Sequence, residues 1–184
     1  MAKGKWAEGI RPRHFCWVLK DRLAISERLG GYGDSHRKVR RTEEIIWVRE
    51  QNFHTVFSLI GAPHNLHNYD EMGVRWEHRP FPHHDELPEY QLQMYQDIHL
   101  HLYQRHRILF HQEEVNGRMI GLIGGYVVWA GLIHETPKAI AIVESIVGRQ
   151  MGPRGRELVT IAQRLPRPPA DMQLAARAAE ADSD

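Results

Sequence analysis

The sequence predicts an α/β domain with a short, mostly parallel central sheet and helices on both faces. The first observation is an apolar run at residues 55–60, bounded by Asn52 and Gly61, which is typical of a central strand buried on both faces. The second is the alternation of helix and strand patterns along the chain. The third is the segment at residues 108–132, in which a short strand, a polar loop and a long apolar helix follow one another.

Strand and helix patterns cover most of the chain. Short apolar and β-branched runs predict strands at residues 14–19, 23–25, 55–60, 74–78 and 108–110. Apolar residues at helical spacing predict helices at residues 43–51, 63–72, 88–106, 118–132, 138–147 and 156–165. One domain is therefore expected at residues 14–165, after a flexible N-terminus at residues 1–13. Residues 166–184 are expected to form a disordered tail, or in part a helix on a partner, because Pro168 and Pro169 block helix continuation.

The start of the first helix is predicted in more detail. Thr42 is expected to be its N-cap, with Glu43 and Glu44 at the positive end of the helix dipole. The preceding residues, 29–41, are expected to form a loop that ends in a basic run at residues 36–41. That run is interpreted as a solvated charged surface, or alternatively as a contact for an acidic partner or a nucleic-acid backbone.

Composition excludes several classes of protein. The chain has 184 residues, enough for one well-buried domain, and a formal net charge of +1, which gives no electrostatic case for nucleic acid or a membrane surface. The single cysteine, Cys16, excludes an internal disulfide and is expected to be a buried, unreactive thiol. The longest apolar stretch, residues 119–133, is shorter than the roughly 20 residues of a membrane-spanning helix. We expect a cytoplasmic protein with no membrane partner.

The segment around the polar loop has the layout of an anion site. Residues 111–117 lie between a strand and a helix, so backbone N–H groups and the positive end of the helix dipole would converge above the strand. Arg118 at the start of the helix would add a guanidinium fork for a phosphate. Together with His111 and Gly117, this Arg resembles the signature loop of the cysteine-dependent protein tyrosine and dual-specificity phosphatases. The resemblance implies a three-layer phosphatase-like fold over roughly residues 15–165, with His111 hydrogen-bonded in the base of the loop.

The loop departs from that family where its chemistry resides. Position 112 is Gln, which supplies no thiolate to attack phosphorus. Glu113 and Glu114 oppose a phosphate dianion, or pair with the loop arginine and fill the pocket from within. Val115 and Met119 stand where the family usually has a Gly and a hydroxyl residue. Four departures in one stretch argue against the family's mechanism.

The resemblance also points to a general acid. In that family an Asp in the loop after the corresponding strand protonates the leaving oxygen. Within residues 79–88, Asp85 is the candidate, although the spacing also allows His83 to occupy this position. Alternatively, Asp85 and Glu86 begin the next helix.

The sequence also contains 13 histidines, which raises the question of a metal site. A metal hydrolase would need three or four ligands to converge, and no compact motif brings such a set together. His99 and His101 lie two residues apart on a helix and so face different sides. Scattered surface histidines are the favoured interpretation, and no metal or cofactor is expected.

Three hypotheses on function follow. The first is a catalytically inactive, phosphatase-like protein that binds an unknown protein partner as a scaffold or regulator, with a phosphate ligand possible but disfavoured. The second is a hydrolase that uses a carboxylate- or metal-activated water in the same pocket. The third is an interaction module centred on the basic residues 37–41. The expected pocket comprises Gln112, Glu113, Glu114, Val115, Asn116, Gly117 and Arg118, and the degenerate catalytic positions are His111, Gln112, Arg118 and Asp85.

Overall fold

The computed structural model describes residues 8–31 and 37–172. The chain forms two compact units. The first unit contains the chain up to Phe81 together with residues His106–Val115, and the second contains Pro82–Arg105 and the chain from Asn116 onward. The predictions for residues 1–7, for residues 32–36 of the expected loop and for the tail beyond residue 172 lie outside the described residues.

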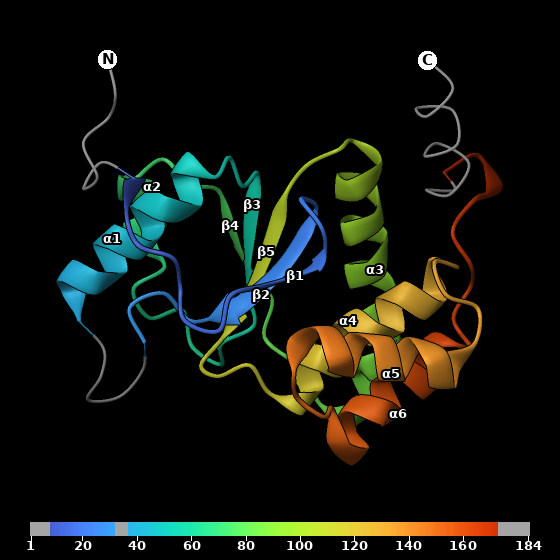
Figure 1. Ribbon diagram of the computed structural model, residues 1–184. Helices are drawn as coiled ribbons and strands as arrows, with labels where there is room; N and C mark the ends of the chain where they lie inside the picture. The colour runs from blue at the N-terminus through green and yellow to red at the C-terminus, as the bar shows by residue number, and fades with distance from the viewer. Residues whose placement is uncertain (1–7, 32–36, 173–184) are drawn as a thin grey trace. The chain divides into compact units, whose positions relative to one another are not determined.

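The first unit is built on a five-stranded sheet (Figure 1). The strands lie in the order β1–β2–β5–β3–β4. Their bounds are Cys16–Leu19 for β1, Leu23–Glu27 for β2, Thr55–Ser58 for β3, Trp76–His78 for β4 and Ile108–Gln112 for β5. β1 pairs with β2 in the antiparallel sense, whereas the β2–β5, β5–β3 and β3–β4 pairs are parallel. The predicted α/β fold with a mostly parallel sheet is confirmed.

The two faces of the sheet carry different parts of the apolar core. All four residues of β3 are buried, as its apolar run predicted. On one face, Leu109 of β5 belongs to a core cluster with helices α1 (Lys38–Glu50) and α2 (His67–Glu71). Because side chains alternate along a strand, Phe57 and Phe110 lie on the opposite face, where their rings stack with centroids 4.8 Å apart.

Helix α1 starts earlier than the sequence predicted. It begins at Lys38, with Arg37 at the N-cap position. Thr42 lies inside the helix, where its hydroxyl donates to the Lys38 carbonyl at 3.1 Å. Both the prediction of Thr42 as N-cap and the placement of residues 38–41 in a loop are therefore wrong.

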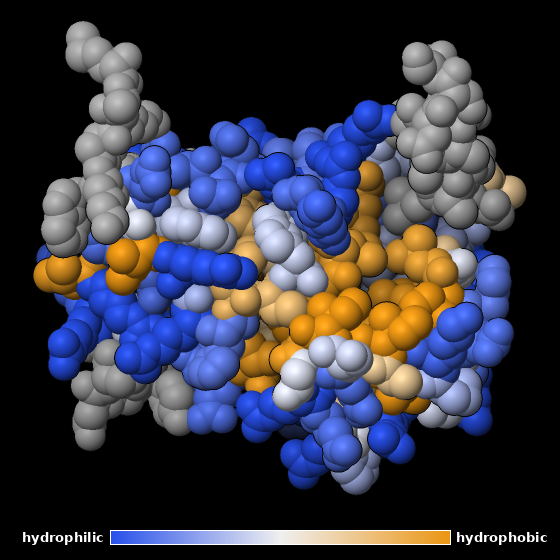
Figure 2. All heavy atoms as spheres, viewed as in Figure 1, coloured by the Kyte–Doolittle hydropathy of each residue, from blue (hydrophilic) through white to orange (hydrophobic). Residues whose placement is uncertain are grey.

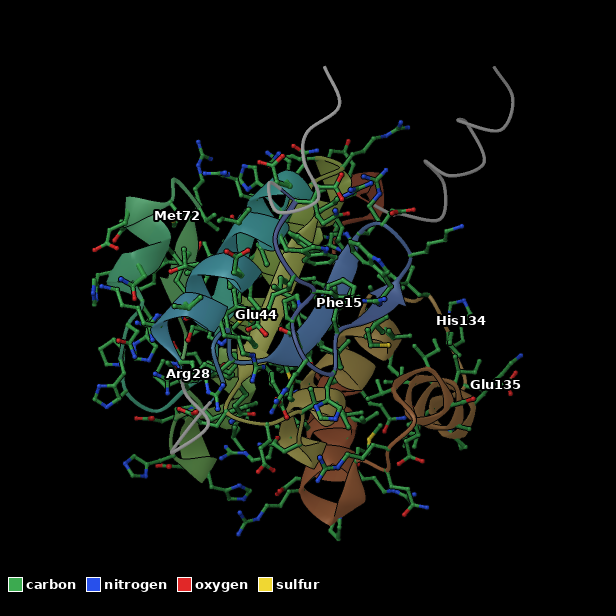
Figure 3. The ribbon with its side chains drawn as sticks, turned by 60° about the vertical axis from the view of Figure 1, so that its left-hand side comes forward. Phe15, Arg28, Glu44, Met72, His134 and Glu135 are labelled. Carbon is green, nitrogen blue, oxygen red and sulfur yellow. The ribbon has the colours of Figure 1, made fainter. Side chains whose placement is uncertain are left out.

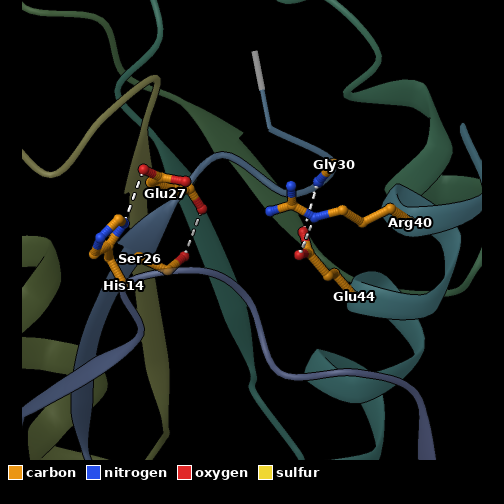
Figure 4. A network of polar contacts seen from close by, with 6 residues as sticks. All are labelled: His14, Ser26, Glu27, Gly30, Arg40 and Glu44. Atoms are coloured by element: carbon orange, nitrogen blue, oxygen red, sulfur yellow. Dashed lines mark hydrogen bonds and ion pairs between the residues drawn. The ribbon is translucent and has the colours of Figure 1, made fainter. Parts of the chain in front are cut away.

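The buried carboxylate of Glu44 explains why the basic run is helical. Its oxygens accept hydrogen bonds from Arg40 at 2.7 Å and from the Gly30 amide at 2.6 Å (Figure 4). The Arg40–Glu44 pair has the i,i+4 spacing that stabilises a helix. Arg41 is only 7% exposed, and burial lowers its pKa, with Arg28 adding repulsion. Interpreting the whole run as a solvated surface is thus wrong for Arg41.

The second unit is helical in the part of the chain that the structure describes. Its elements are the 3₁₀ turn η3 (His84–Glu86), the helices α3 (Leu87–Tyr103), α4 (Gly117–Trp129), α5 (Thr136–Val147) and α6 (Gly152–Ala162), and the 3₁₀ turn η4 (Ala170–Met172). α6 begins before the predicted residue 156, with Pro153 in its first turn. α4 is buried from Met119 to Trp129, as expected for a helix that is apolar on all sides.

Glycines allow α4 and α6 to approach closely. A Cβ atom on Gly121 of α4 would lie 2.3 Å from the Cα and carbonyl oxygen of Gly155 on α6. A larger residue at this crossing would therefore push the two helices apart. Helix α3 joins the packing through hydrogen bonds. The Tyr95 hydroxyl donates to the Leu122 carbonyl at 3.0 Å, and the Gln91 amide donates to the Leu158 carbonyl at 2.9 Å.

The surface of the second unit includes apolar side chains. Figure 2 shows apolar residues gathered over the region of α5, and the side chains of Ile142 and Ile146 on this helix are exposed.

Among the described residues, no helix is both long and apolar enough to cross a bilayer.

Candidate functional site

The predicted signature loop is divided between the two units. Residues 111–115 belong to the first unit and residues 116–118 to the second. β5 continues through Gln112, which pairs with Glu27 of β2, so His111 and Gln112 lie in the strand and not in the loop. The expectation of a loop at residues 111–117 is corrected at these two positions, because the parallel neighbour β2 extends far enough to pair with them.

His111 lies in the buried centre of the sheet. Its exposure is 0%, and in register it faces Ser26 on β2 and Ser58 on β3, which are buried as well. The ring of Tyr69 from α2 stacks against its imidazole, with ring centroids 6.0 Å apart. Burial raises the pKa of the Tyr69 hydroxyl, and the charge of Glu44 adds to this.

The environment of His111 keeps its imidazole neutral. Burial, with smaller electrostatic contributions from Arg28 and His78, lowers the pKa of His111 to about 3. Within the described residues, neither ring nitrogen has a hydrogen-bond partner, and the same holds for the Ser58 hydroxyl. His111 was expected to form hydrogen bonds in the base of the loop. Instead it lies in β5, and its ring nitrogens form no hydrogen bond within the described residues.

Gln112 stands where the resemblance requires the nucleophile. The residue is half-buried, and its side-chain carbonyl oxygen is buried with no hydrogen-bond partner in the described part of the chain. The cysteine that the chain does possess, Cys16, lies in β1. Cys16 is half-buried and not fully buried as predicted, and its burial raises the pKa of the thiol, which favours the protonated form.

Glu113 is bound by an arginine that the sequence did not single out. Arg28, directly after β2, donates to the two carboxylate oxygens of Glu113 at 2.9 and 3.2 Å. Its guanidinium also donates to the His64 carbonyl at 3.3 Å, and its backbone amide donates to the Gln112 carbonyl at 2.6 Å. Figure 3 labels Arg28 together with Glu44 of the neighbouring helix α1. Arg28 thus neutralises one of the two carboxylates that were expected to oppose a phosphate.

The remaining loop residues serve the start of α4. Asn116 is the N-cap, and its side-chain oxygen accepts from the Met119 amide at 3.1 Å. A Cβ atom on Gly117 would lie 2.0 Å from the Met151 carbonyl oxygen, so glycine is required for this close approach. One amide at the helix N-terminus is therefore satisfied from within the chain, and Gly117 faces protein backbone.

A pocket in the second unit contains Arg118. Its volume is about 390 Å³, and it is lined by Pro82, His83, His84, Leu87, Arg118, Arg154, Glu157 and Leu158. Burial lowers the pKa of Arg118, and the nearby charge of Arg154 lowers it further. The imidazole of His84 lies 3.4 Å from the carboxylate of Glu157.

The candidate general acid does not line this pocket. Asp85 is exposed on η3, while its neighbours His83 and His84 are among the lining residues. The alternative that Asp85 and Glu86 begin the next helix is close to the observed arrangement, since the turn runs directly into α3 at Leu87. Arg154 was missed because it lies between the helices predicted at residues 138–147 and 156–165, whereas α6 begins at Gly152.

The histidines differ in their exposure. His64, His67, His83 and His84 are exposed, as the surface interpretation predicted. His99 is instead buried, with ring nitrogens 3.0 Å from the Tyr126 hydroxyl and 2.6 Å from the Met172 carbonyl. Burial lowers the pKa of His99, although the contact with Met172 opposes this. His99 and His111 are therefore core residues.

Comparison with known proteins identifies the fold. No family model and no curated protein matches the chain. Among solved structures, the active form of Tk-PTP matches with a TM-score of 0.64 and 16% identity, covering 82% of this chain and 97% of that one. The kinase associated phosphatase with its catalytic-site cysteine substituted by serine matches with a TM-score of 0.69 and 14% identity over 84% of this chain and 96% of that one.

A third match is the core catalytic domain of the PP-IP phosphatase SIW14 from S. cerevisiae in complex with citrate. Its TM-score is 0.60 at 12% identity, covering 94% of this chain and 96% of that one. At such low identities the likeness concerns the fold and not the activity. The chain thus has the fold of the cysteine-based protein tyrosine and dual-specificity phosphatases over most of its length, while its single cysteine lies at position 16, outside the segment that follows β5.

Proposed function

We propose that this protein is a phosphatase-fold protein without cysteine-based chemistry, and that it acts by binding, as a scaffold or regulatory partner. The observation that carries the proposal is Gln112 at the end of β5, in the position that the resemblance assigns to the nucleophile. A carboxamide is neither an effective nucleophile toward phosphorus nor convertible to one by a lowered pKa. A covalent phosphoenzyme therefore cannot form at this position as it does on a thiolate.

The surroundings of Gln112 support the proposal. His111 is neutral and buried, so it offers no positive charge to activate a neighbouring group. The oxygens of Glu113 are engaged by Arg28, which makes this carboxylate a poor base for activating water. In the second unit, Asn116 already accepts from the Met119 amide. Glu113 and the amide of Met119 thus already have structural partners in this chain.

The proposal is tested by assaying hydrolysis of an aryl phosphate by the natural protein and by the Gln112→Cys variant, each with and without a chelator. We expect no turnover by the natural protein. Turnover by the natural protein would overturn the proposal, and its loss with chelator would favour a metal-activated water. Activity gained by Gln112→Cys would show that the rest of the anion site is retained.

The binding role needs its own control. If Gln112→Cys is also inactive, circular dichroism and thermal unfolding of both proteins distinguish a folded but rebuilt loop from a misfolded variant. A folded, inactive variant supports a site that has been rebuilt for binding. The wild-type chain and this variant should then have similar unfolding midpoints, because position 112 is at the end of a strand and only half-buried.

A further inference from the structure

A proline-rich segment follows α6 and lies against other helices of the second unit (Figure 1). This proline segment comprises residues 165–172, with the sequence Leu-Pro-Arg-Pro-Pro-Ala-Asp-Met, and it has no helix or strand before the turn η4. The side chains of Pro166, Arg167 and Pro169 are exposed. Because proline fixes one backbone dihedral angle and favours an extended chain, such a segment loses little conformational entropy when it is bound.

The indole of Trp129 holds the start of the proline segment. Trp129 is the last residue of α4, and its indole nitrogen donates to the Pro166 carbonyl at 2.6 Å. Its ring belongs to an aromatic cluster with Tyr126 of the same helix and His99 of α3, whose ring centroids lie 6.1 and 5.5 Å from that of Trp129. Surfaces lined by aromatic rings are a recurrent means of binding proline-rich chains.

The arginine of the proline segment binds the end of α4. The Arg167 guanidinium donates to the carbonyls of Val128 and Trp129, the latter at 3.0 Å. The last turn of α4 carries no basic residue of its own. Because the carbonyls at a helix C-terminus carry partial negative charge, a guanidinium that comes from another part of the chain is stabilised there. The site therefore selects for a cationic side chain at this position.

His99 holds the far end of the proline segment. Its Nε2 lies 2.6 Å from the Met172 carbonyl oxygen, and its Nδ1 lies 3.0 Å from the Tyr126 hydroxyl. A carbonyl oxygen only accepts, so Nε2 carries the proton and the Tyr126 hydroxyl donates to Nδ1. His99 and Trp129 thus both donate to backbone carbonyls, which any extended chain offers, while the end of α4 accepts from the arginine.

We propose that the surface formed by the end of α4 and by His99 of α3 is a recognition site for an extended, proline-rich segment that carries an arginine and belongs to another protein. The proline segment of this chain fills the site in cis. Since it has exposed side chains and is held by a few polar contacts, it can detach while the helices beneath it stay folded. The inference rests on the proposed binding function and names the kind of partner.

The test measures fluorescence anisotropy of a labelled peptide with the sequence of residues 165–172 and an amidated end, mixed with the full chain. In the natural protein the attached segment competes at a millimolar effective concentration, so the free peptide should bind weakly. Arg167→Gln removes the guanidinium of the attached segment and should tighten binding of the free peptide by about tenfold. Because Arg167 is exposed, this variant should fold normally, which its unfolding midpoint checks.

Three controls define what the site recognises. Arg164→Gln is the matched variant, because Arg164 is exposed and lies directly before the proline segment. Its affinity for the peptide should equal that of the natural protein. A second peptide, with Gln in place of its arginine, should bind the Arg167→Gln chain about tenfold more weakly than the first. Adding Trp129→Phe to that chain should weaken binding of the first peptide by a similar factor, because the indole donor is lost.

The outcomes separate this inference from the proposed function. No binding of the peptide to the Arg167→Gln chain, or equal binding of the two peptides, would overturn the site without bearing on catalysis. Equal affinity of the natural and Arg167→Gln chains would also overturn it, since the peptide would then bind elsewhere. Phosphate release from an aryl phosphate would instead overturn the proposed inactivity and leave the peptide site in place.

Sedimentation of the natural chain tests the remaining occupant, a second copy of this protein. The chain should be a monomer, because its own proline segment fills the site. A dimer that Arg167→Gln abolishes would show that two copies exchange their proline segments, and would overturn the assignment to another protein.

Discussion

Arg28 and Glu113 form an ion pair that joins the chain directly after β2 to the chain directly after β5. Arg28 donates to the two carboxylate oxygens of Glu113 at 2.9 and 3.2 Å, although the residues are 85 positions apart in the sequence. The Arg28 side chain is 11% exposed and that of Glu113 is 40% exposed. The pair fixes the first residue of the segment in which a phosphatase would hold its substrate.

This relationship predicts a measurable coupling between the two residues. Arg28→Ala should lower the free energy of unfolding by about 1–2 kcal/mol, because it removes charge-assisted hydrogen bonds from a largely buried guanidinium. Glu113→Ala should cost less, about 1 kcal/mol or below, since its carboxylate is partly solvated. Urea unfolding of both single variants and the double variant gives the coupling energy. Strictly additive losses would contradict a direct interaction.

His111 predicts a specific dependence of stability on pH. The unfolded chain takes up a proton at this imidazole near pH 6.5, whereas the folded chain does so only near pH 3. Between these values the unfolded state binds more protons, so stability falls as the pH falls, with a slope approaching about 1.4 kcal/mol per pH unit from this residue. Above pH 6.5 the contribution is constant.

The control for this prediction is His111→Phe, which removes the titrating group and its two unpartnered nitrogens. Comparing chemical unfolding of both proteins from pH 7 to pH 4 isolates the histidine from the carboxylates, which titrate in both. The variant should lose less stability on acidification than the natural protein. Parallel curves for the two proteins would show that His111 is not held neutral in the fold.

The contact between Gly121 and Gly155 predicts unequal effects for two similar substitutions. Gly121→Ala should cost about 3 kcal/mol or more, because the added Cβ would meet backbone atoms of α6 at 2.3 Å. For Gly124→Ala on the same helix, the tightest contact is the flexible end of the Met151 side chain at 3.3 Å, and the other neighbours are side-chain atoms at 3.6 Å or more. Its cost should be offset by the gain of about 1 kcal/mol in helix propensity. Thermal unfolding that ranks the variants in the opposite order would contradict the packing.

The N-cap residue Asn116 is expected to contribute to the free energy of unfolding through its hydrogen bond at the start of α4. Asn116→Ala should lower stability by about 1 kcal/mol, because the Met119 amide loses its acceptor. Asn116→Asp retains an acceptor and should be close to the natural protein in the same urea titration. Equal losses in the two variants would indicate that the side chain acts through some contact other than the cap.

The main strands and helices could be predicted from local patterns, and the failures have tertiary causes. The residues of β3 are all buried, and the apolar run in the sequence was enough to predict this burial. The start of α1 could not be predicted from the local sequence, because it depends on the hydrogen bond between the Gly30 amide and the carboxylate of Glu44. The start of α6 was missed because Gly155 resembles a loop residue, whereas it is required for the contact with α4.

The candidate site was predicted in its composition and less well in its arrangement. The absence of a nucleophile at Gln112 is a property of the sequence alone. The extension of β5 through His111 depends on pairing with Ser26 and Ser58, which no local pattern reports. Arg154 was not predicted either, because its relation to Arg118 arises from the packing of α6 on α4.

We propose that the natural chain does not hydrolyse phosphate monoesters. The most direct measurement is phosphate release from an aryl phosphate at a protein concentration high enough to detect a single turnover, with Gln112→Cys measured in parallel. We expect no release above the uncatalysed rate by the natural protein. Release of one or more equivalents by the natural protein, with or without added metal, would contradict it.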